Sequence, residues 1–548
     1  MANINPKAIL TMKKIFCIAA LCAVAVSAMA LPARREGVIR TAEDGTEKIV
    51  YLHGDAFCHY MTDAEGNWLD EQTLLPMTAE QKEARVAHHT ARANMRRAQQ
   101  VNKVGGKINL APRGLIILVN FKDLSFKTPY DTIHEMLNGD NFTRSYDVEY
   151  TYGTQTYRGH VDASGSAKQY FHDQSWGQYN PQFDVVGPVT LNQNYSYYGK
   201  NNSQGDDQNV DAMVREACNA VNSEVDFTLY DNDQDGKVDF VYFIYAGFGE
   251  ADGGEENTIW PHNYDYQYYV TYGSPQLTVD GKKISNYACS NELQYLGGEY
   301  AGIGTFCHEF SHVLGLPDLY VTVNMSNPPH TPSDWSVLDY GPYLNEGNTP
   351  PAYSAYERFF MGWITPRVLD EPEGVWLHPL NTSKEALILC EGNTHNLDGF
   401  NPNPKQFYIL ECRTQTGWDK YLPGKGMLIT KINYNATKWA DNTVNNSRNS
   451  MGVDIIEAKT NTSKYGLSTD AFPAGAKSWY GFDDHEIEDI KLQRDGTVTF
   501  SYRGGYVVEA IEDVQSDPIQ STKVLRDGQL IIVRGGVMYD PLGRTIDR

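Results

Sequence analysis

The chain has 548 residues, of which 41% are hydrophobic and 21% are charged, the proportions of a globular protein rather than of a disordered one. One hydrophobic core does not grow this large, so we expect three or more structural units. The formal net charge of -23 argues against nucleic acid or an anionic membrane as a partner and is typical of a soluble, secreted protein.

Residues 1–30 have the pattern of a secretory signal peptide. Lys13 and Lys14 precede an apolar run at residues 15–26, and Ser-Ala-Met-Ala at residues 27–30 follows it with a small-x-small pattern, so we expect cleavage after Ala30. No later run is apolar for 18 residues, so we expect no other membrane span. Six cysteines remain, an even number that is compatible with disulfides outside the cytosol, although their pairing cannot be deduced: Cys58, Cys218, Cys289, Cys307, Cys390 and Cys412.

The next stretch, residues 31–105, indicates a propeptide. Residues 31–68 are rich in turns and short strand patterns, and residues 78–104 contain few large apolar side chains, as in an exposed helix or linker. Arg96-Arg97 offers a site for proteolytic nicking. The alternative is an ordinary accessory β domain.

The apolar strand at residues 114–121 begins the predicted catalytic domain. Residues 166–172 and 211–221 have the capping and apolar spacing of helices. We expect the strand at residues 287–296 to be the sheet edge on which a peptide substrate lies.

An acidic loop precedes the strand at residues 240–245. Alternating carboxylates and a glycine for the sharp turn form the first half of a calcium-binding loop. The twelfth position is Tyr242 rather than the glutamate of an EF-hand, so we expect an isolated calcium loop, with a solvated acidic turn as the alternative. The predicted calcium ligands are Asp231, Asp233, Asp235 and Asp239.

The sequence HEFSH at residues 308–312 contains candidate metal ligands and a candidate general base. Residues four apart share one face of a helix, so His308 and His312 can bind one metal ion. Glu309 lies beside the first histidine, where it can take a proton from a metal-bound water. Gly315 can end the helix and turn the chain back, so that Asp318 supplies a third ligand. Two histidines, one carboxylate and an open position are the ligands of a catalytic zinc site.

Cys307 points about 100° away from His308 on a helix, which makes it a buried apolar residue or half of a disulfide rather than a ligand. Cys58, in the propeptide, could bind the zinc as a thiolate and so maintain latency. Steric blocking is the alternative mechanism.

Residues 366–503 show the short strands and turns of a β-rich domain. The last 45 residues form a further β unit around the run at residues 523–534, in which we identify no acid, base or ligand.

The chain resembles the immune inhibitor A-like family of secreted bacterial metallopeptidases over about residues 110–500. The resemblance rests on the HExxHxxGxxD motif, the acidic loop, and residues 259–262, 352–363 and 417–424. It implies a zinc endopeptidase with a metzincin-like catalytic domain. Tyr340 resembles the tyrosine that stabilises the oxyanion in some metzincins, and Leu338 stands where methionine is usual in the turn below the metal, a nearly volume-conserving replacement. Glu357 is the alternative third ligand.

Residues 504–548 resemble the sorting domain of proteins exported by the type IX secretion system, which implies secretion or attachment to the outer cell surface. The alternative is a last strand pair that completes the preceding sheet.

The sequence therefore predicts an α+β protein whose zincin-like catalytic domain, at residues 106–365, has a mixed sheet and an active-site helix. A sandwich-like β-rich domain (366–503) and a sorting domain (504–548) follow it. The predicted function is a secreted zinc endopeptidase made as a zymogen, with catalytic Zn²⁺, structural Ca²⁺ and protein or peptide substrates. The alternatives are a non-catalytic surface adhesin and a cell-wall peptide amidase.

Overall fold

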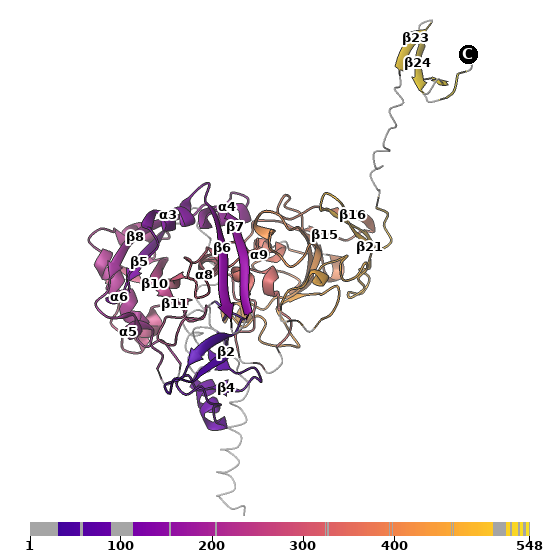
Figure 1. Ribbon diagram of the computed structural model, residues 1–548. Coiled ribbons are helices and arrows are strands. Elements are labelled where there is room, and N and C mark those ends of the chain that lie inside the picture. Colours follow the sequence, from indigo (N-terminus) through magenta and orange to yellow (C-terminus); the bar gives the residue numbers. More distant parts are fainter. Residues whose placement is uncertain are drawn as a thin grey trace, which may run out of the picture.

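The computed structural model describes residues 31–54, 59–88 and 113–507, apart from 153–154, 203–204, 324, 326–327, 394, 397, 462 and 464, and, near the C-terminus, residues 522–526, 529–534, 537–540 and 544–546. The predicted signal peptide, Cys58 and Arg96-Arg97 lie outside the described residues. Within the described part, no helix has the length and apolar character of a membrane span. Several sheets and a few short helices make up a mixed α and β protein (Figure 1), as the sequence predicted at this coarse level.

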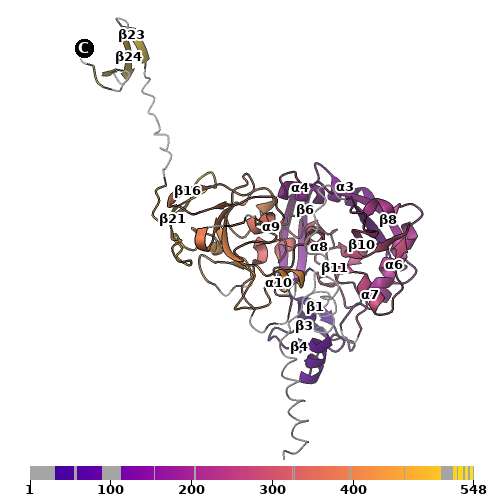
Figure 2. The ribbon, with the colours of Figure 1, turned by 180° about the vertical axis from the view of Figure 1, so that it is seen from behind.

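The N-terminal unit is an antiparallel sheet with the order β1-β2-β3-β4. Its buried apolar residues belong to the same core cluster as one face of the central sheet. Both views place this unit beneath the junction between the central sheet and the β-rich region (Figures 1 and 2). Its strands are β1 Val38–Thr41, β2 Glu47–His53, β3 Tyr60–Thr62 and β4 Trp68–Leu69.

The central sheet has the order β11-β14-β10-β5-β8. Its four longer strands run parallel, and only the short edge strand β11 is antiparallel to its neighbour. The expectation that residues 287–296 form the edge is therefore wrong, because β14 is paired on both sides and β11 is the edge. The strands are β5 Arg113–Asn120, β8 Gln182–Thr190, β10 Val241–Phe248, β11 His262–Asp265 and β14 Asn286–Leu293.

Successive side chains of β5 point to opposite faces of this sheet and enter different core clusters. Ile116 and Leu118 lie in one cluster, and Leu115 and Ile117 lie in the other. A continuous apolar run is typical of a parallel strand that is covered on both faces. Helix α6 (Val210–Val221) covers one face, whereas the other face is covered by α3 (Tyr130–Asn138), α4 (Ala167–Gln174), α8 (Gly304–Val313) and α9 (Ala355–Phe360).

Local sequence signals explain several of these boundaries. The hydroxyl of Ser166 accepts a hydrogen bond from the amide of Gln169 at 3.2 Å, and so caps α4 as predicted. The remaining short helices are α5 Tyr195–Gly199, α7 Gln267–Thr271 and α10 Ala436–Ala440, with 3-10 turns η1 Phe227–Tyr230, η2 Ser333–Trp335, η3 Gly341–Tyr343, η4 Glu391–Asn393, η5 Gly417–Asp419 and η6 Ser468–Asp470.

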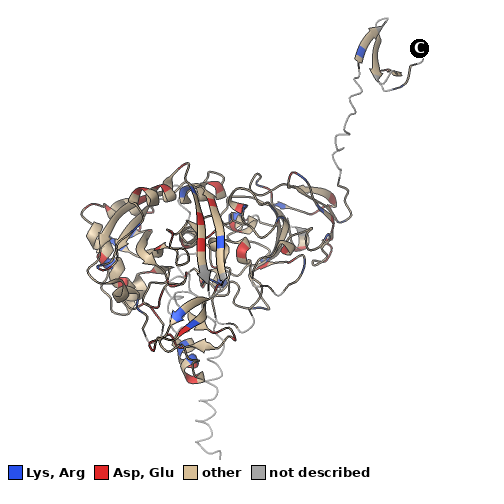
Figure 3. Cartoon of the chain, in the orientation of Figure 1, with Lys and Arg blue, Asp and Glu red and all other residues tan. Residues whose placement is uncertain are grey.

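A long hairpin, β6 (Thr143–Tyr152) and β7 (Gln155–Ser164), crosses the front of the molecule in Figure 1. It carries acidic and basic residues on its strands (Figure 3), among them the exposed pair Glu149 and Arg158. A further small sheet joins β9 (Lys237–Val238), β12 (Thr278–Val279) and β13 (Lys282–Ile284).

The region after residue 366 contains two sheets. One has the order β15-β17-β18-β19-β20, and the other has the order β16-β22-β21. Residues of β18 and β19 enter both the core between these sheets and the core beneath α8, so hydrophobic packing is continuous with the catalytic region. The strands are β15 Arg367–Val368, β16 Glu373–Leu377, β17 Leu387–Leu389, β18 Gln406–Arg413, β19 Gly426–Asn433, β20 Val453–Ile455, β21 Ile487–Leu492 and β22 Val498–Tyr502.

The C-terminal part contains an antiparallel sheet of β23 (Thr522–Arg526), β24 (Gln529–Arg534) and β25 (Val537–Tyr539). The pairing of β23 with β24 is the hairpin that the strand and turn pattern predicted. Both views show this small sheet apart from the rest of the molecule (Figures 1 and 2).

Candidate metal centre and active site

Helix α8, which carries the histidines, begins where backbone segments approach closely. A Cβ atom on Gly304 would lie 2.0 Å from the carbonyl oxygen of Pro342, so glycine is needed there. At the other end Gly315 has a φ of 92°, and its amide donates to the carbonyl of His312 at 3.0 Å. This left-handed ending turns the chain back toward the histidines, as the sequence predicted.

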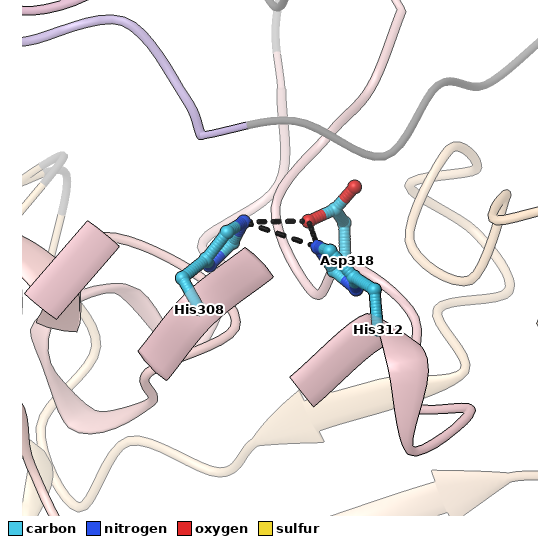
Figure 4. Close-up of side chains that lie close together, drawn as sticks. All are labelled: His308, His312 and Asp318. Carbon is cyan, nitrogen blue, oxygen red and sulfur yellow. Dashed lines mark hydrogen bonds and ion pairs between the residues drawn. The ribbon is translucent and has the colours of Figure 1, made fainter. Parts of the chain in front are cut away.

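Three side chains converge beyond this turn: His308, His312 and Asp318 (Figure 4). The Nε2 atoms of the two histidines are 3.2 Å apart, and each lies 3.2 Å from Oδ1 of Asp318. A tetrahedral zinc ion with bonds of about 2.1 Å separates its ligand atoms by roughly 3.4 Å. All three side chains are buried. The donor atoms and their spacing therefore fit zinc.

Backbone carbonyls fix the orientation of both imidazoles. Nδ1 of His308 lies 2.7 Å from the carbonyl oxygen of Val337, and Nδ1 of His312 lies 2.8 Å from that of Leu316. Since each Nδ1 carries the proton that it donates, each Nε2 presents a lone pair. Two lone pairs cannot hydrogen-bond to each other, whereas a cation between them satisfies both.

Asn442 holds the carboxylate of Asp318 from the β-rich region. Its Oδ1 accepts a hydrogen bond from the Asp318 amide at 2.6 Å, and its Nδ2 donates to Oδ2 of the same residue at 2.6 Å. The remaining oxygen, Oδ1, faces the histidines. Burial raises the pKa of Asp318, but positive charge at this group, from protons on His312 and His308 or from a metal cation in their place, outweighs that effect and lowers the pKa. The carboxyl group is thus ionised, as a metal ligand requires.

Glu309 follows His308 on α8 and is fully buried. The N-terminal segment, residues 31–37, precedes strand β1. In this segment, the backbone amide of Leu31 donates a hydrogen bond to Oε1 of Glu309 at 2.9 Å. In Figure 4 the pale indigo N-terminal segment lies to the upper left of the three converging side chains. The predicted general base is therefore in contact with the part of the chain that was predicted to be the propeptide.

Leu338 and Tyr340 belong to the turn that follows η2. Leu338 is buried in the core beneath α8, and its carbonyl accepts a hydrogen bond from the amide of Leu319 at 2.8 Å. The turn is thereby joined to the segment that carries Asp318. The guanidinium of Arg35 lies 3.5 Å above the ring of Tyr340, and burial raises the pKa of the Tyr340 hydroxyl.

Glu357, the alternative third ligand, lies in a different environment. Its Oε1 accepts a hydrogen bond from the hydroxyl of Ser336 at 2.6 Å, and its Oε2 accepts one from the amide of Ser354 at 2.5 Å. It completes the capping box of α9. The structure brings Asp318, and not Glu357, to the two histidines.

The described cysteines contribute no ligand to this group. Cys307, on α8, is a buried free thiol, as are Cys218, Cys289 and Cys412. Burial raises the pKa of the Cys307 thiol, which keeps it in the protonated form that packs as an apolar side chain.

The acidic loop brings together three of its four predicted ligands. One carboxylate oxygen from each of Asp231, Asp233 and Asp235 lies within 4.8 Å of the others. Asp239 instead accepts hydrogen bonds from the amide and side chain of Asn232, at 2.6 and 2.7 Å. The ammonium of Lys282 lies 2.5 Å from Oδ2 of Asp231 and supplies positive charge to the same loop.

Residues 100–364 match the family described as immune inhibitor A peptidase M6, catalytic domain. Over these residues the chain is similar to the catalytic domain of M6 peptidases. The M6 match contains both histidines, Glu309 and Asp318, and it confirms the predicted enzyme class, a zinc metallopeptidase, at the level of this domain.

Curated relatives of the M6 domain carry related names. The chain is 25% identical over 271 residues to the pre-pro-metalloprotease PrtV of Vibrio cholerae, an alignment that covers 45% of this chain and 29% of PrtV. It is 26% identical over 284 residues to Immune inhibitor A of Bacillus thuringiensis, which covers 45% of this chain and 39% of that protein. The chain thus spans less than half the length of these relatives.

Sequence reasoning missed two side chains near the M6 site. Asn442 lies in a loop after α10, and no spacing connects it to the HEFSH motif. Trp260 donates from Nε1 to the carbonyl oxygen of Leu31 at 3.2 Å. It lies within residues 259–262, which the resemblance had marked without giving the tryptophan a role.

Proposed function

We propose that the protein is a secreted zinc endopeptidase that hydrolyses peptide bonds in proteins and is made as a zymogen. The observation that carries this proposal is the convergence of His308, His312 and Asp318 beside the buried carboxylate of Glu309, all within the M6 match. A binding module has no use for a general base beside a set of metal ligands.

His308, His312 and Asp318 would hold the zinc. The ion would supply Lewis acidity to the scissile carbonyl and lower the pKa of the attacking water. Glu309 takes the proton from that water and passes it to the leaving amine. Tyr340 is the candidate hydrogen-bond donor to the oxyanion.

Hydrolysis of unfolded casein by the processed protein tests this function. We expect cleavage that a zinc chelator abolishes and that added zinc restores. A processed protein that binds zinc but cleaves neither casein nor other proteins would favour the adhesin. Cleavage confined to cell-wall peptides would favour the amidase.

The zymogen proposal rests on the contacts of the N-terminal segment with the proposed active-site residues. Besides the contact of Leu31 with Glu309, the hydroxyl of Tyr343 donates to the carbonyl oxygen of Pro32 at 2.7 Å. Arg35 covers the ring of Tyr340. The segment thus contacts the proposed base and the proposed oxyanion donor together, which supports steric blocking. The name of the Vibrio relative, a pre-pro-metalloprotease, agrees with such a precursor.

The loop that contains Asp231, Asp233 and Asp235 is proposed to bind calcium. Calcium that binds the folded state alone raises stability with the logarithm of its concentration. The unfolding temperature of the metal-stripped protein should therefore rise in millimolar calcium, and Asp233→Asn should reduce the rise. An unfolding temperature that does not change with calcium would contradict calcium binding. Lys282 would then be the loop's source of positive charge.

Export is proposed to use the N-terminal signal peptide and, at residues 504–548, recognition by type IX secretion machinery. Deletion of the C-terminal residues should leave a stable peptidase in the periplasm. Export of the truncated enzyme to the medium would contradict the sorting role.

A further inference from the structure

Arg34 of the N-terminal segment lies in an acidic pocket of the catalytic region. Its Nε is 3.1 Å from Oδ1 of Asp252, and its Nη2 is 3.3 Å from Oε2 of Glu346. The guanidinium also lies 5.7 Å from the ring centroid of Tyr343. Only 5% of Arg34 is exposed. A pocket with two carboxylates and an aromatic ring selects a positively charged side chain.

Arg35 occupies a second pocket, which has the shape of a slot. Its guanidinium lies 3.5 Å from the ring centroid of Tyr340 and 4.5 Å from that of Tyr465. Its Nη1 is 3.3 Å from Oδ2 of Asp334, and its Nη2 donates to the hydroxyl of Ser333 at 2.7 Å. Two aromatic rings with a carboxylate and a hydroxyl at one end match a flat, charged guanidinium.

The contact with Glu309 shows which residue of the N-terminal segment corresponds to which position of a bound substrate. The general base returns its proton to the leaving amine, which is the nitrogen of the first residue after the scissile bond. The nitrogen of Leu31 lies 2.9 Å from Glu309 Oε1. Leu31 therefore stands in the first position after the scissile bond, and Arg34 and Arg35 stand in the fourth and fifth.

The hydrogen bonds to the first and second positions go to the peptide backbone and do not depend on side-chain identity. Trp260 and Tyr343 donate to the carbonyl oxygens of Leu31 and Pro32, which any peptide presents. Charged side chains are recognised at Arg34 and Arg35. These two pockets can therefore discriminate among substrate sequences by charge.

Removal of the N-terminal segment takes the cations away from these carboxylates. Asp252 is 6% exposed, and burial raises its pKa even with Arg34 beside it. A buried carboxylate without a counter-ion is unfavourable, so a basic side chain that enters the vacated pocket regains the lost interaction.

We propose that, in the processed enzyme, the two pockets bind basic residues of the substrate at the fourth and fifth positions after the scissile bond. This inference rests on the proposed endopeptidase function and names its substrate class. Proteins with paired arginines or lysines shortly after the cleavage site are the preferred substrates.

The test uses quenched fluorogenic peptides with an Ala-Leu bond and two further alanines, followed by Arg-Arg, Gln-Gln or Glu-Glu. We expect kcat/KM to fall at least tenfold from Arg-Arg to Gln-Gln, mainly through KM, and further for Glu-Glu. Asp252→Asn and Asp334→Asn should each lower the ratio of kcat/KM for the Arg-Arg peptide to kcat/KM for the Gln-Gln peptide. Because Tyr465 is 48% exposed, Tyr465→Ala can replace Asp334→Asn if that variant does not fold.

Equal rates for Arg-Arg and Gln-Gln, with casein still cleaved, would overturn the inference and leave the proposed function standing. If neither peptides nor casein are cleaved, the proposed function fails, and calorimetric titration of the processed protein with the hexapeptide LPARRE decides about the pockets. We expect LPARRE to bind at least tenfold more tightly than LPAQQE. Equal affinities would overturn the inference by that route as well.

Discussion

Asn442 is joined to Asp318 by two hydrogen bonds of 2.6 Å across 124 positions of sequence. These bonds occupy Oδ2 of the carboxylate and leave Oδ1 for the metal. A group that orients a ligand in this way typically contributes about 10–100-fold to metal affinity.

We therefore expect Asn442→Ala to lower zinc affinity about 10–100-fold, as measured by competition with a fluorescent chelator. Asn446→Ala is the matched control, because Asn446 lies in the same loop but accepts from the amide of Thr322, at 2.9 Å, rather than holding a ligand. In the same series Asp318→Ala should weaken zinc binding further, and Glu357→Ala should leave it unchanged. Equal affinities for the Asn442 and Asn446 variants would show that the asparagine does not support the site.

At the scale of single residues, the sequence predicts those site residues whose positions follow from local backbone geometry. The spacing of His308 and His312 follows from the helical period, and Gly315 supplies the turn that returns Asp318 to them. Asn442 could not be predicted, because its contact depends on how the β-rich region packs against α8. A single asparagine in a polar loop carries no signal of such a contact.

Arg413, at the end of strand β18, ties the β-rich region to the loops around the active site. It is fully buried, and its guanidinium contacts both oxygens of Asp419, at 2.9 and 2.6 Å, and Oε1 of Glu411 at 3.3 Å. Arg413 also donates to the carbonyl oxygen of Ala352, just before α9. The network therefore holds the segment that leads into α9.

Replacement of Arg413 by methionine keeps much of the volume and leaves two buried carboxylates without their cation. Breaking a buried pair in this way costs about 3–5 kcal/mol in the free energy of unfolding, so we expect Arg413→Met to lower the denaturation midpoint strongly.

Arg158→Met is the control for this variant, because Arg158 pairs with Glu149 on the exposed hairpin, where ion pairs contribute little. We expect its midpoint to stay unchanged. Equal effects of the two replacements would contradict a structural role for the buried network.

Elements with dense or periodic patterns were predictable. The apolar runs of β5 and β10 and the capped helix α4 follow from their residues alone. The edge of the central sheet was misassigned, because β11 has only four residues, His262–Asp265, and gives no periodic signal. The nearly continuous burial of β14 is the property of an interior strand.

The whole molecule brings three distant parts of the chain into contact around Arg35. Arg35 of the N-terminal segment contacts Asp334 of the catalytic region and Tyr465 of the β-rich region. No sequence pattern connects these residues, so the position of the N-terminal segment could be found only from the tertiary structure. Its contacts with Glu309 and Tyr340 explain how one short segment can maintain latency.

The paired variant Arg34→Ala and Arg35→Ala, made in the full chain, tests this anchoring. Loss of both guanidinium groups removes the charged contacts of the segment, and we expect casein hydrolysis by the uncleaved chain to rise at least tenfold. Gel analysis checks that the chain stays intact. Glu65→Ala, in an exposed turn of the same unit, should remain latent. Undiminished latency of the paired variant would mean that the arginines do not hold the segment in place.

The claim that Glu309 acts as the general base beside a zinc site is tested most directly by Glu309→Gln in the processed protein, with zinc content and casein hydrolysis measured on one preparation. We expect the variant to retain zinc at the wild-type ratio, because Glu309 is not among the three converging ligands. Hydrolysis should fall by about two to four orders of magnitude, the usual contribution of a general base. Casein cleavage near the wild-type rate, with zinc still bound, would contradict the account.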